Sequence, residues 1–282
     1  MNPHTLAAAR VDPAGPSASF VDFSLPQLAI PTIPRIHAEV GRYRLRLAES
    51  AEDLEAVCRL RFRVFNMELG EGLDSSYETG LDTDPFDRIC EHLLVEDKQE
   101  SPSRGIVGTY RMQSGITAGR NLGYYSAQEF ELRPYEPLRP EILELGRASI
   151  DREHRTPEVL TLLWRGIAQY ANDKGLRYLM GCSSLTSRNP AEGRQLYQQL
   201  EHFRVPDEFA TDPTPGYGCP VDQAAGEEEL VKVPKLLKTY LAIGARIAAP
   251  PAWDRAFGTI DFLTLLDLKM LSSAARNRFL AR

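Results

Sequence analysis

An acid and a base lie three residues apart in the segment "LELGRASI", as Glu144 and Arg147. In a regular strand their side chains would point to opposite faces. The apolar residues of the segment are Leu143, Leu145, Ala148 and Ile150. They occupy odd positions first and even positions afterwards, so the two-residue alternation of a strand changes phase halfway along the segment. A β-bulge at Gly146, where glycine tolerates unusual dihedral angles, would keep all of these apolar side chains on one face. The same bulge would place Glu144 and Arg147 together on the other face.

Such a pair can carry out proton-transfer chemistry. A buried carboxylate acts as a general base when its surroundings raise its pKa toward the working pH, and a neighbouring guanidinium can hold it in place. Backbone groups freed where a bulge interrupts the ladder can polarise a carbonyl group. The alternative is a surface ion pair, which is the commonest arrangement of opposite charges and contributes little to stability. The change of phase favours the functional interpretation.

The segments around this strand predict an α/β fold with a mixed sheet. Strands are expected in "RYRLRLA", in "HLLVED" and "GIVGTYRM" as a hairpin, in the bulged segment, and in "LRYLMGCSS". Helices are expected from the capping box at Ser50 to Gly70, from the N-cap Thr156 to Gly175, and in "PAEGRQLYQQL". The last third of the chain predicts a helix, a Pro-Pro turn and an apolar strand.

Composition limits the class of protein. The 282 residues, 43% of them hydrophobic, suffice for a substantial core, and the net charge of -6 argues against a nucleic-acid binder. Residues 1–40 are proline-rich without a sustained period and predict a flexible arm, and residues 41–282 predict the folded domain. No apolar run is long enough to span a bilayer and no signal peptide is evident, so a cytoplasmic protein is expected. Four scattered cysteines lack metal-ligand spacing, so no metal is expected.

Four motifs, in chain order, resemble those of the GNAT-fold acyltransferases, specifically their long-chain N-acyltransferase branch. They are "LRFRVF", "DPFD", "GTYRM" and "ELGR", which supply Arg61 and Phe65, Asp84 and Asp87, Arg111, and Glu144 and Arg147. The resemblance implies a GNAT-like acyl-CoA N-acyltransferase fold, with a mixed, twisted sheet, a bulged central strand and flanking helices. It also implies a family-specific C-terminal segment from about residue 228 to 282.

Within this branch the sequence looks like the ornithine-lipid-type L-ornithine Nα-acyltransferases and N-acyl amino acid synthases, and more distantly like acyl-homoserine-lactone synthases. The tryptophan that the lactone synthases usually carry after the first helix is absent from "NMELGEG". The segments "EHLLVED", "YYSAQEFEL" and "PAWDRAFGTIDFLTLL" look like those of the amino-acid N-acyltransferases instead.

The resemblance implies transfer of a long-chain fatty acyl group to the α-amine of ornithine or a related amino acid, giving an N-acyl amino acid. Glu144 would accept the proton of the ammonium group and Arg147 would hold Glu144. Acidic and basic side chains would bind the zwitterionic amino acid, and the candidates are Arg61, Asp84, Asp87, Arg111, Asp254 and Asp261. Phe65 and the leucine-rich C-terminal strand would line the tunnel for the acyl chain. The amino acid, the chain length and a 3-hydroxyl group on the chain are left open.

The donor site of this chain departs from the usual GNAT phosphate loop, [RQ]-x-x-G-x-[GA], because the corresponding run is "REHRTP". Arg155 replaces a glycine, and Pro157, which has no N–H, replaces the last position. A loop with fewer backbone donors and an added cation suits one phosphodiester better than a pyrophosphate. Arg152, Arg155 and Thr156 are therefore expected to bind the phosphopantetheine of acyl carrier protein, with acyl-CoA the less favoured donor and no cofactor bound permanently.

Alternatives remain at this stage. One is an acyl-homoserine-lactone-type signal synthase, and another is a non-catalytic module that binds acyl chains or acyl carrier protein. Taken alone, Asp84 and Asp87 are more often solvated or turn-forming side chains, Arg61 can extend along the edge of the core, and Arg111 can neutralise an acidic neighbour. The protein is also expected to contact the inner membrane peripherally.

Overall fold

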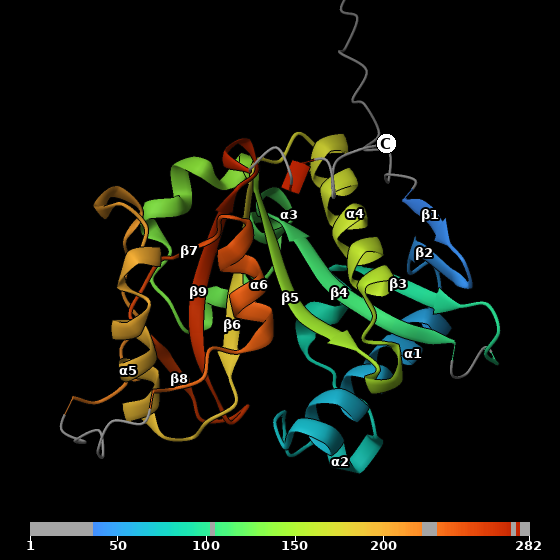
Figure 1. The fold of residues 1–282 in the computed structure, drawn as a ribbon, viewed down its shortest axis with the longest axis horizontal. Coiled ribbons are helices and arrows are strands. Elements are labelled where there is room, and N and C mark those ends of the chain that lie inside the picture. Colours follow the sequence, from blue (N-terminus) through green and yellow to red (C-terminus); the bar gives the residue numbers. More distant parts are fainter. Residues whose placement is uncertain (1–35, 102–104, 222–229, 272–274, 277–282) are drawn as a thin grey trace, which may run out of the picture. The chain divides into compact units, whose positions relative to one another are not determined.

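The strands of the protein form one mixed sheet in the computed structural model, which describes residues 36–101, 105–221, 230–271 and 275–276 (Figure 1). The nine strands of this part of the chain are β1 (His37–Val40), β2 (Tyr43–Leu47), β3 (Glu91–Asp97), β4 (Ile106–Ser114), β5 (Ile142–Ile150), β6 (Tyr178–Leu185), β7 (Arg246–Ile247), β8 (Ala252–Asp254) and β9 (Thr259–Asp267). Their order is β1-β2-β3-β4-β5-β6-β9-β7, and β8 pairs with β9. Among these pairs β5 and β6 run parallel, while the others run antiparallel.

Helices cover both faces of this sheet. They are α1 (Ala51–Phe62), α2 (Ser76–Thr79), α3 (Gly115–Arg120), α4 (Pro157–Asp173), α5 (Pro190–Gln199) and α6 (Lys235–Ile243). Neighbouring residues of β3 point to opposite faces, so Leu93 packs with α4 and Leu94 packs with α1. Tyr240 of α6 joins the α4 side, and Ala118 of α3 packs into a cluster with Ile142 on the other side. The expected α/β fold with a mixed sheet and flanking helices is confirmed.

The first strand falls in a segment that the sequence analysis assigned to the flexible arm. Residues 37–40 form β1, which pairs with β2 through a tight turn at Gly41, whose φ is +58°. Glycine adopts this left-handed backbone without the steric cost that a Cβ imposes. The predicted boundary at residue 40 is therefore too late, because strand β1 already lies before it. Residues 1–35 lie outside the described part of the chain.

The bulge in β5 exists, but not at Gly146. The register between β4 and β5 shifts between Arg111, which faces Gly146, and Thr109, which faces Ser149, so Arg147 and Ala148 together oppose one residue. Arg147 has a φ of 49°, whereas Gly146 is not among the glycines with positive φ. The apolar residues on both sides of the bulge pack into the α4 core, as expected. Arg147, held by its side-chain contacts, thus has the unusual backbone conformation that the sequence predicted for Gly146.

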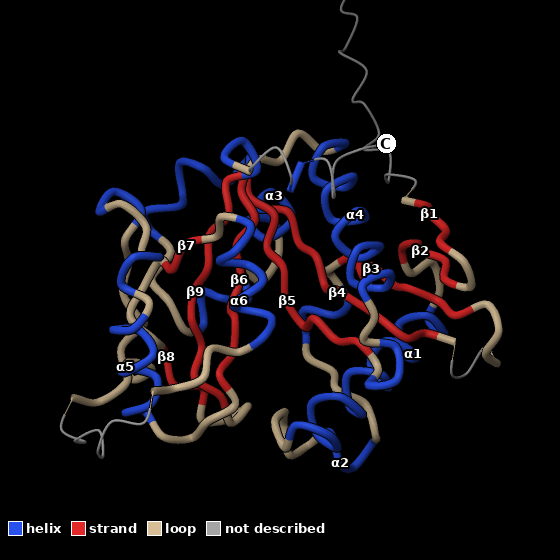
Figure 2. Tube along the Cα trace, in the orientation of Figure 1, coloured by secondary structure: helices blue, strands red, loops and turns tan. Residues whose placement is uncertain are grey.

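β5 and β6 part before the bulge. Their parallel ladder joins only residues 142–144 to residues 178–180, and β6 continues to residue 185 paired with β9 alone. At the end of the ladder a Cβ on Gly181 would lie 2.1 Å from the carbonyl oxygen of Leu145, so only glycine fits this close approach. Figure 2 shows the two strands diverging from their common end, with α6 beside the opening. The central sheet therefore contains a wedge-shaped opening.

Candidate active site

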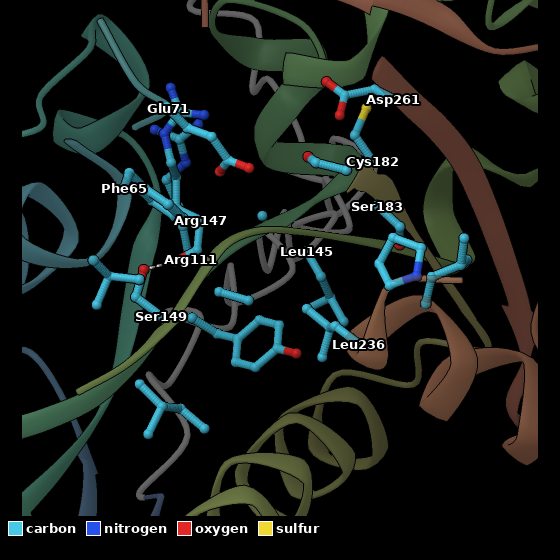
Figure 3. A pocket seen from close by; sticks show the side chains of 18 of the residues that line it. Phe65, Glu71, Arg111, Leu145, Arg147, Ser149, Cys182, Ser183, Leu236 and Asp261 are labelled. Atoms are coloured by element: carbon cyan, nitrogen blue, oxygen red, sulfur yellow. Dashed lines mark hydrogen bonds between the residues drawn. The ribbon is translucent and has the colours of Figure 1, made fainter. Parts of the chain in front are cut away.

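A pocket of about 910 Å³ occupies the opening between β5 and β6. Its lining comes from both faces of the sheet. On one face α6 contributes Leu236 and Leu237, and on the other the π-helical turn η1 (Arg63–Leu69) contributes Phe65. Acidic and basic side chains, Glu71, Arg111, Arg147 and Asp261 among them, line one region (Figure 3). The pocket therefore passes through the sheet and combines a charged region with an apolar one.

Glu144 lies at the last residue pair of the β5–β6 ladder and lines this pocket. Its carboxylate accepts backbone hydrogen bonds of 2.8 Å from the N–H groups of Tyr125 and Ser126, at the start of the short 3-10 helix η3 (Tyr125–Gln128). Burial raises the pKa of Glu144 above the ordinary value, and these two hydrogen bonds oppose that rise without cancelling it. A carboxylate offers about four acceptor positions, so positions beyond these two remain for other donors.

Gln113 is a positioning residue that the sequence analysis missed. It faces Glu144 across the β4–β5 ladder. Its Nε2 donates to Glu144 Oε2 at 3.2 Å and to the carbonyl oxygen of Gly123 at 2.9 Å. A glutamine within a strand carries no spacing signal, and only the register identifies it.

Arg147 shares the non-core face of β5 with Glu144, as expected, but it does not hold Glu144. Its Nη2 donates to Asp84 at 3.1 Å and its Nη1 donates to the Tyr125 hydroxyl at 3.2 Å. Its guanidinium lies 4.6 Å from the ring centroid of Phe257 and 4.8 Å from that of Tyr125. The expected Glu144–Arg147 contact is wrong because backbone N–H groups of η3 already bind the carboxylate, while aspartates and aromatic rings bind the guanidinium.

Arg61 is buried in an ion cluster beneath the pocket. Its Nε donates to Asp82 at 2.6 Å and its Nη1 donates to Asp87 at 2.7 Å, and Arg61 and Asp82 have no exposed surface. Burial alone would raise the pKa of Asp87, but the hydrogen bond and charge of Arg61, with the charge of Arg111, outweigh it and hold this pKa far below its usual range. Neither Arg61 nor Asp87 lines the pocket. Arg61 and Asp87 support the site through Arg111, which also binds Asp87. Asp82 was not among the expected residues.

Arg111 connects this cluster to the pocket. Its Nη1 donates to Asp84 at 2.7 Å and to Asp87 at 2.9 Å. Its Nη2 is buried without a hydrogen-bond partner in the part of the chain that the structure describes, and the side chain lines the pocket. Asp84 is not in the lining, so the residues of "DPFD" bind arginines of the protein. Arg111 keeps one donor that a ligand could use.

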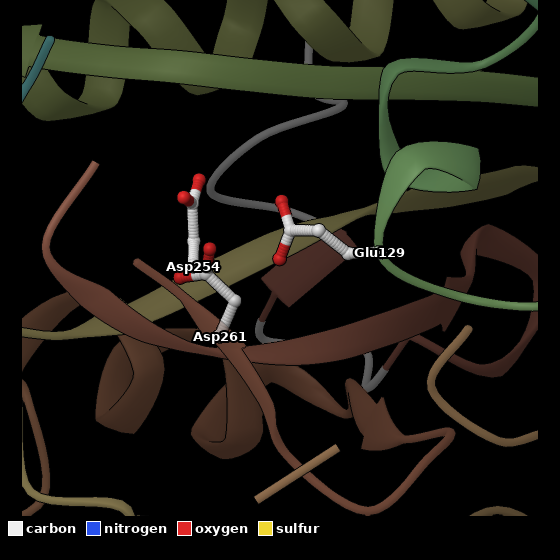
Figure 4. A group of neighbouring side chains, drawn as sticks. All are labelled: Glu129, Asp254 and Asp261. Atoms are coloured by element: carbon white, nitrogen blue, oxygen red, sulfur yellow. The ribbon is translucent and has the colours of Figure 1, made fainter. Parts of the chain in front are cut away.

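Asp254 and Asp261 line the pocket, and a third carboxylate joins them. Glu129, which follows η3, offers an oxygen that lies within 4.8 Å of oxygens of both aspartates (Figure 4). Three such carboxylates could hold a metal ion or another cation. Glu129 has no local signal in the sequence, because the three segments that carry these carboxylates meet only in the fold. We call Glu129, Asp254 and Asp261 the acidic trio.

The apolar walls differ in part from those expected. Phe65 lines the pocket, but the leucines of β9 do not line its main part. Leu236 and Leu237 of α6, with Leu160 of α4, take that place. The leucines of β9 instead fill the cores on the two faces of the sheet.

The N-terminus of α4 forms another edge of the pocket. Thr156 caps the helix by accepting from the N–H of Val159, and Thr156, Arg155 and Pro157 all line the pocket. Arg155 makes a bidentate ion pair with Glu68 at 2.6 and 2.7 Å, so its charge is partly engaged. Arg152 is exposed in the 3-10 helix η5 (Arg152–His154) and lies outside the pocket lining.

Two lysines that the sequence analysis did not single out lie at the same pocket. Lys232 and Lys235 are exposed and belong to its lining, Lys235 at the first position of α6. They add positive charge near Arg155. Within the described residues, no helix combines the length and the apolar character that crossing a membrane requires.

Known proteins are similar to this chain in sequence and in fold. A family model described as acetyltransferase (GNAT) domain matches residues 60–165. The chain is 33% identical to an L-ornithine Nα-acyltransferase of Brucella abortus (strain 2308), over 86% of this chain and 93% of that protein. It is 32% identical to the enzyme of the same name from Rhizobium meliloti (strain 1021), over 85% of each chain.

A solved structure shares the fold at low identity. FeeM, an N-acyl amino acid synthase from uncultured soil microbes, superposes with a TM-score of 0.50 at 12% sequence identity, covering 82% of this chain and 95% of that one. The protein is an acyltransferase, and the chain belongs to the GNAT-fold family of the L-ornithine Nα-acyltransferases.

Proposed function

We propose that this enzyme transfers a long-chain acyl group, 3-hydroxylated chains included, from acyl carrier protein to the α-amine of ornithine. The observation that carries this proposal is the position of Glu144. It lies where β5 and β6 part, in a pocket with carboxylates in one region and an apolar wall in another. A cationic amino acid fits the first region and an acyl chain fits the second. The names of the relatives support ornithine as the acceptor.

In the proposed reaction Glu144 takes a proton from the α-ammonium group, directly or through water. The neutral amine then attacks the thioester carbonyl carbon and the C–N bond forms. The nitrogen of the tetrahedral intermediate gives up its second proton, and collapse of the intermediate breaks the C–S bond and releases the thiolate, which takes up that proton to become the thiol. Backbone groups freed at the bulge after Gly146 would bind the oxyanion. No covalent enzyme intermediate is needed.

Arg111 is the proposed partner of the substrate carboxylate. Its buried Nη2 has no hydrogen-bond partner among the described residues, and a buried donor left unpaired costs free energy that a carboxylate ligand would recover. Arg147 and the cluster around Arg61 hold the walls of the site. Asp84 and Asp87 contribute by fixing Arg111.

Positive charge in the lining of the pocket supports an acidic carrier protein as donor. The lining includes Arg155, Lys232 and Lys235, and Pro157, the first residue of α4, has no N–H for a pyrophosphate. Exposed apolar side chains of η1, Met67 and Leu69, support peripheral contact with the inner membrane from the cytoplasm, because Leu69 also lines the pocket.

The test is an assay of the purified protein with ornithine and acyl carrier protein that bears a long-chain acyl group. Mass spectrometry should detect Nα-acylornithine, and acyl-CoA of the same chain should give a lower kcat/KM. Glycine, serine and homoserine lactone serve as competing acceptors. A product made only from S-adenosylmethionine or homoserine lactone would identify a signal synthase, and binding without any turnover would contradict the enzymatic proposal.

A further inference from the structure

The acidic trio is built from three separate segments. Glu129 follows η3, Asp254 ends β8, and Asp261 lies near the start of β9. Their oxygens approach to within 4.8 Å of one another (Figure 4). The backbone fixes two of the positions, because Asp254 Oδ1 accepts from the N–H groups of Ala256 and Phe257 at 2.9 Å, and Asp261 lies inside the β6–β9 ladder.

Two oxygens of the trio are buried without a donor. Glu129 is 2% exposed and Asp261 is 5% exposed. Within the described residues, neither Glu129 Oε2 nor Asp261 Oδ1 has a hydrogen-bond partner. An unpaired buried carboxylate is strongly unfavourable, and proteins normally compensate it with a donor or a cation. The trio is therefore an incomplete cation site at the wall of the pocket.

The pKa directions of these buried carboxyls agree with a shortage of positive charge at the trio. Burial, with the charges of Asp261 and Asp254, raises the pKa of Glu129 well above its ordinary value. Burial also raises the pKa of Asp261, against hydrogen bonds with Ser184 and with the Glu129 carboxyl that lower it, so a proton on Glu129 is shared with Asp261 when no cation is bound. Arg147 acts on both carboxyls in the opposite sense, but it already binds Asp84 and Tyr125. Glu71, another buried acid of the lining, adds to the excess of negative charge.

We propose that the acidic trio binds the side-chain ammonium of a diamino acid and thereby selects this class of acceptor. The inference rests on the proposed acylation of an amino acid at Glu144. An ammonium group has three free N–H donors, and acceptors at about 2.8 Å from its nitrogen in tetrahedral directions lie roughly 4.6 Å apart. The spacing of the trio accommodates such a group. Each carboxylate would supply one acceptor.

The trio lies at a suitable distance from Glu144, since one turn of chain connects them. Ser126 donates its N–H to Glu144, and the N–H of Glu129 donates to the carbonyl oxygen of Ser126 at 3.1 Å. Glu144 and two members of the trio, Asp254 and Asp261, line the same pocket. One amino group of the substrate would lie at Glu144 and the other at the trio, joined by the alkyl chain of the substrate.

The experiment compares L-ornithine with L-norvaline, which has the same carbon skeleton without the second amino group. Wild-type enzyme should prefer ornithine. Asp261→Asn and Glu129→Gln should each lower kcat/KM for ornithine by about 30-fold or more, as expected for loss of one partner of a buried charge pair, while norvaline changes less than about threefold. Asp267→Asn, the same change on the same strand at its far end, where Asp267 pairs with Arg177, is the matched control and should keep the preference.

Binding is measured in parallel as the increase in Tm that ornithine produces. Wild type should show an increase that Asp261→Asn loses and Asp267→Asn keeps. If wild type acylates ornithine and norvaline equally, or if Asp261→Asn keeps the preference, the inference is overturned while acyl transfer stands. If no acceptor is acylated, the proposed function fails, and absence of an ornithine-induced increase in Tm then overturns the subsite too.

A metal ion is the competing occupant. Dialysis against EDTA should leave the preference for ornithine unchanged. Loss of this preference on dialysis, with recovery on adding Mg²⁺, Ca²⁺ or Mn²⁺, would identify a metal site and overturn the assignment to an ammonium group.

Discussion

Glu144 and Arg147 lie on one face of β5, with Arg147 in the bulge itself, yet they bind separate partners. Backbone N–H groups of Tyr125 and Ser126 hold the carboxylate, and Asp84 and the Tyr125 hydroxyl bind the guanidinium. The bulge therefore divides two tasks along one strand. Glu144, before the bulge, contacts the reacting amine in the proposed mechanism, and Arg147, within the bulge, fixes the wall.

Glu144→Gln should lower kcat by about 10²–10⁴-fold with a smaller change in KM, because a general base acts in the transition state. The pH–rate profile should also lose its acidic limb, which reports a carboxyl of raised pKa. Steady-state kinetics from pH 5 to 9 measure both. Turnover at the wild-type level in a folded variant would exclude Glu144 as the base.

Substitution of Gly123 should lower stability, whereas substitution of Gly146 should lower activity. Gly123 has a φ of +82°, so Gly123→Ala should lower the free energy of unfolding by about 1 kcal/mol. An added Cβ on Gly146 meets no atom within 4 Å, and its φ is not positive, so Gly146→Val should change stability little. Its side chain would enter the pocket instead and lower kcat/KM.

Urea unfolding and kinetics of these two variants distinguish the effects. No backbone strain is expected from a side chain at residue 146, because Arg147 and not Gly146 has the left-handed backbone. A large loss of stability in Gly146→Val, equal to that of a core substitution, would contradict the placement of the bulge.

Arg61→Met should lower the free energy of unfolding by about 3–5 kcal/mol, because it removes the shortest cationic contacts of the buried Asp82 and Asp87. Arg59→Met is the control on the same helix. Arg59 is exposed and pairs with Glu55 four residues earlier, so its loss should cost less than about 0.5 kcal/mol. Equal effects of the two substitutions would show that the buried cluster adds nothing to stability.

The pH dependence of unfolding provides a second measure of this cluster. The folded pKa of Asp87 lies below its unfolded value, so its contribution is complete above about pH 4 and is lost as the pH falls. Wild type should lose more stability than Arg61→Met between about pH 5 and 3. Urea titrations at several pH values measure this difference.

Neutralising the trio should stabilise the free enzyme. The folded pKa values of Glu129 and Asp261 lie above the unfolded ones, so the stability linked to their protonated forms is complete at low pH and is lost as the pH rises. Asp261→Asn should therefore raise Tm by about 2–4 °C at pH 8 without ornithine, and this gain should shrink toward pH 4. Calorimetry measures it, and a lower Tm at pH 8 would contradict the unpaired burial of Asp261.

Lys235→Glu should raise KM for acylated carrier protein about tenfold at low salt, and the effect should weaken at high salt. Lys238→Glu, on the same helix and outside the pocket lining, should have little effect. Both variants should leave KM for ornithine unchanged. The same KM for the carrier in both variants would place the docking surface elsewhere.

The sequence predicted the order of the elements and the bulged strand because hydrophobic periodicity records which side of a strand is buried. The change of phase after Leu145 marked the bulge, but the residue with positive φ was an arginine, which composition does not indicate. Arg147 adopts that conformation because tertiary contacts compensate its cost.

The motifs named most residues of the site without their partners. Arg61, Asp84 and Asp87 were expected to bind substrate, whereas the structure pairs them with one another and with Arg111 and Asp82. Charge pairing between distant segments depends on the fold. For the same reason Glu129 had no local signal, since it meets Asp254 and Asp261 only after β8 and β9 form.

The parted strands have a consequence for ligand binding. Residues 145–150 of β5 and 181–185 of β6 face the opening without a ladder between them, so the sheet has two inner edges. An edge binds any chain that carries amide groups at suitable spacing, and phosphopantetheine carries two amides in an extended arm. A bound thioester would thus act as a missing strand and complete the sheet through the substrate itself.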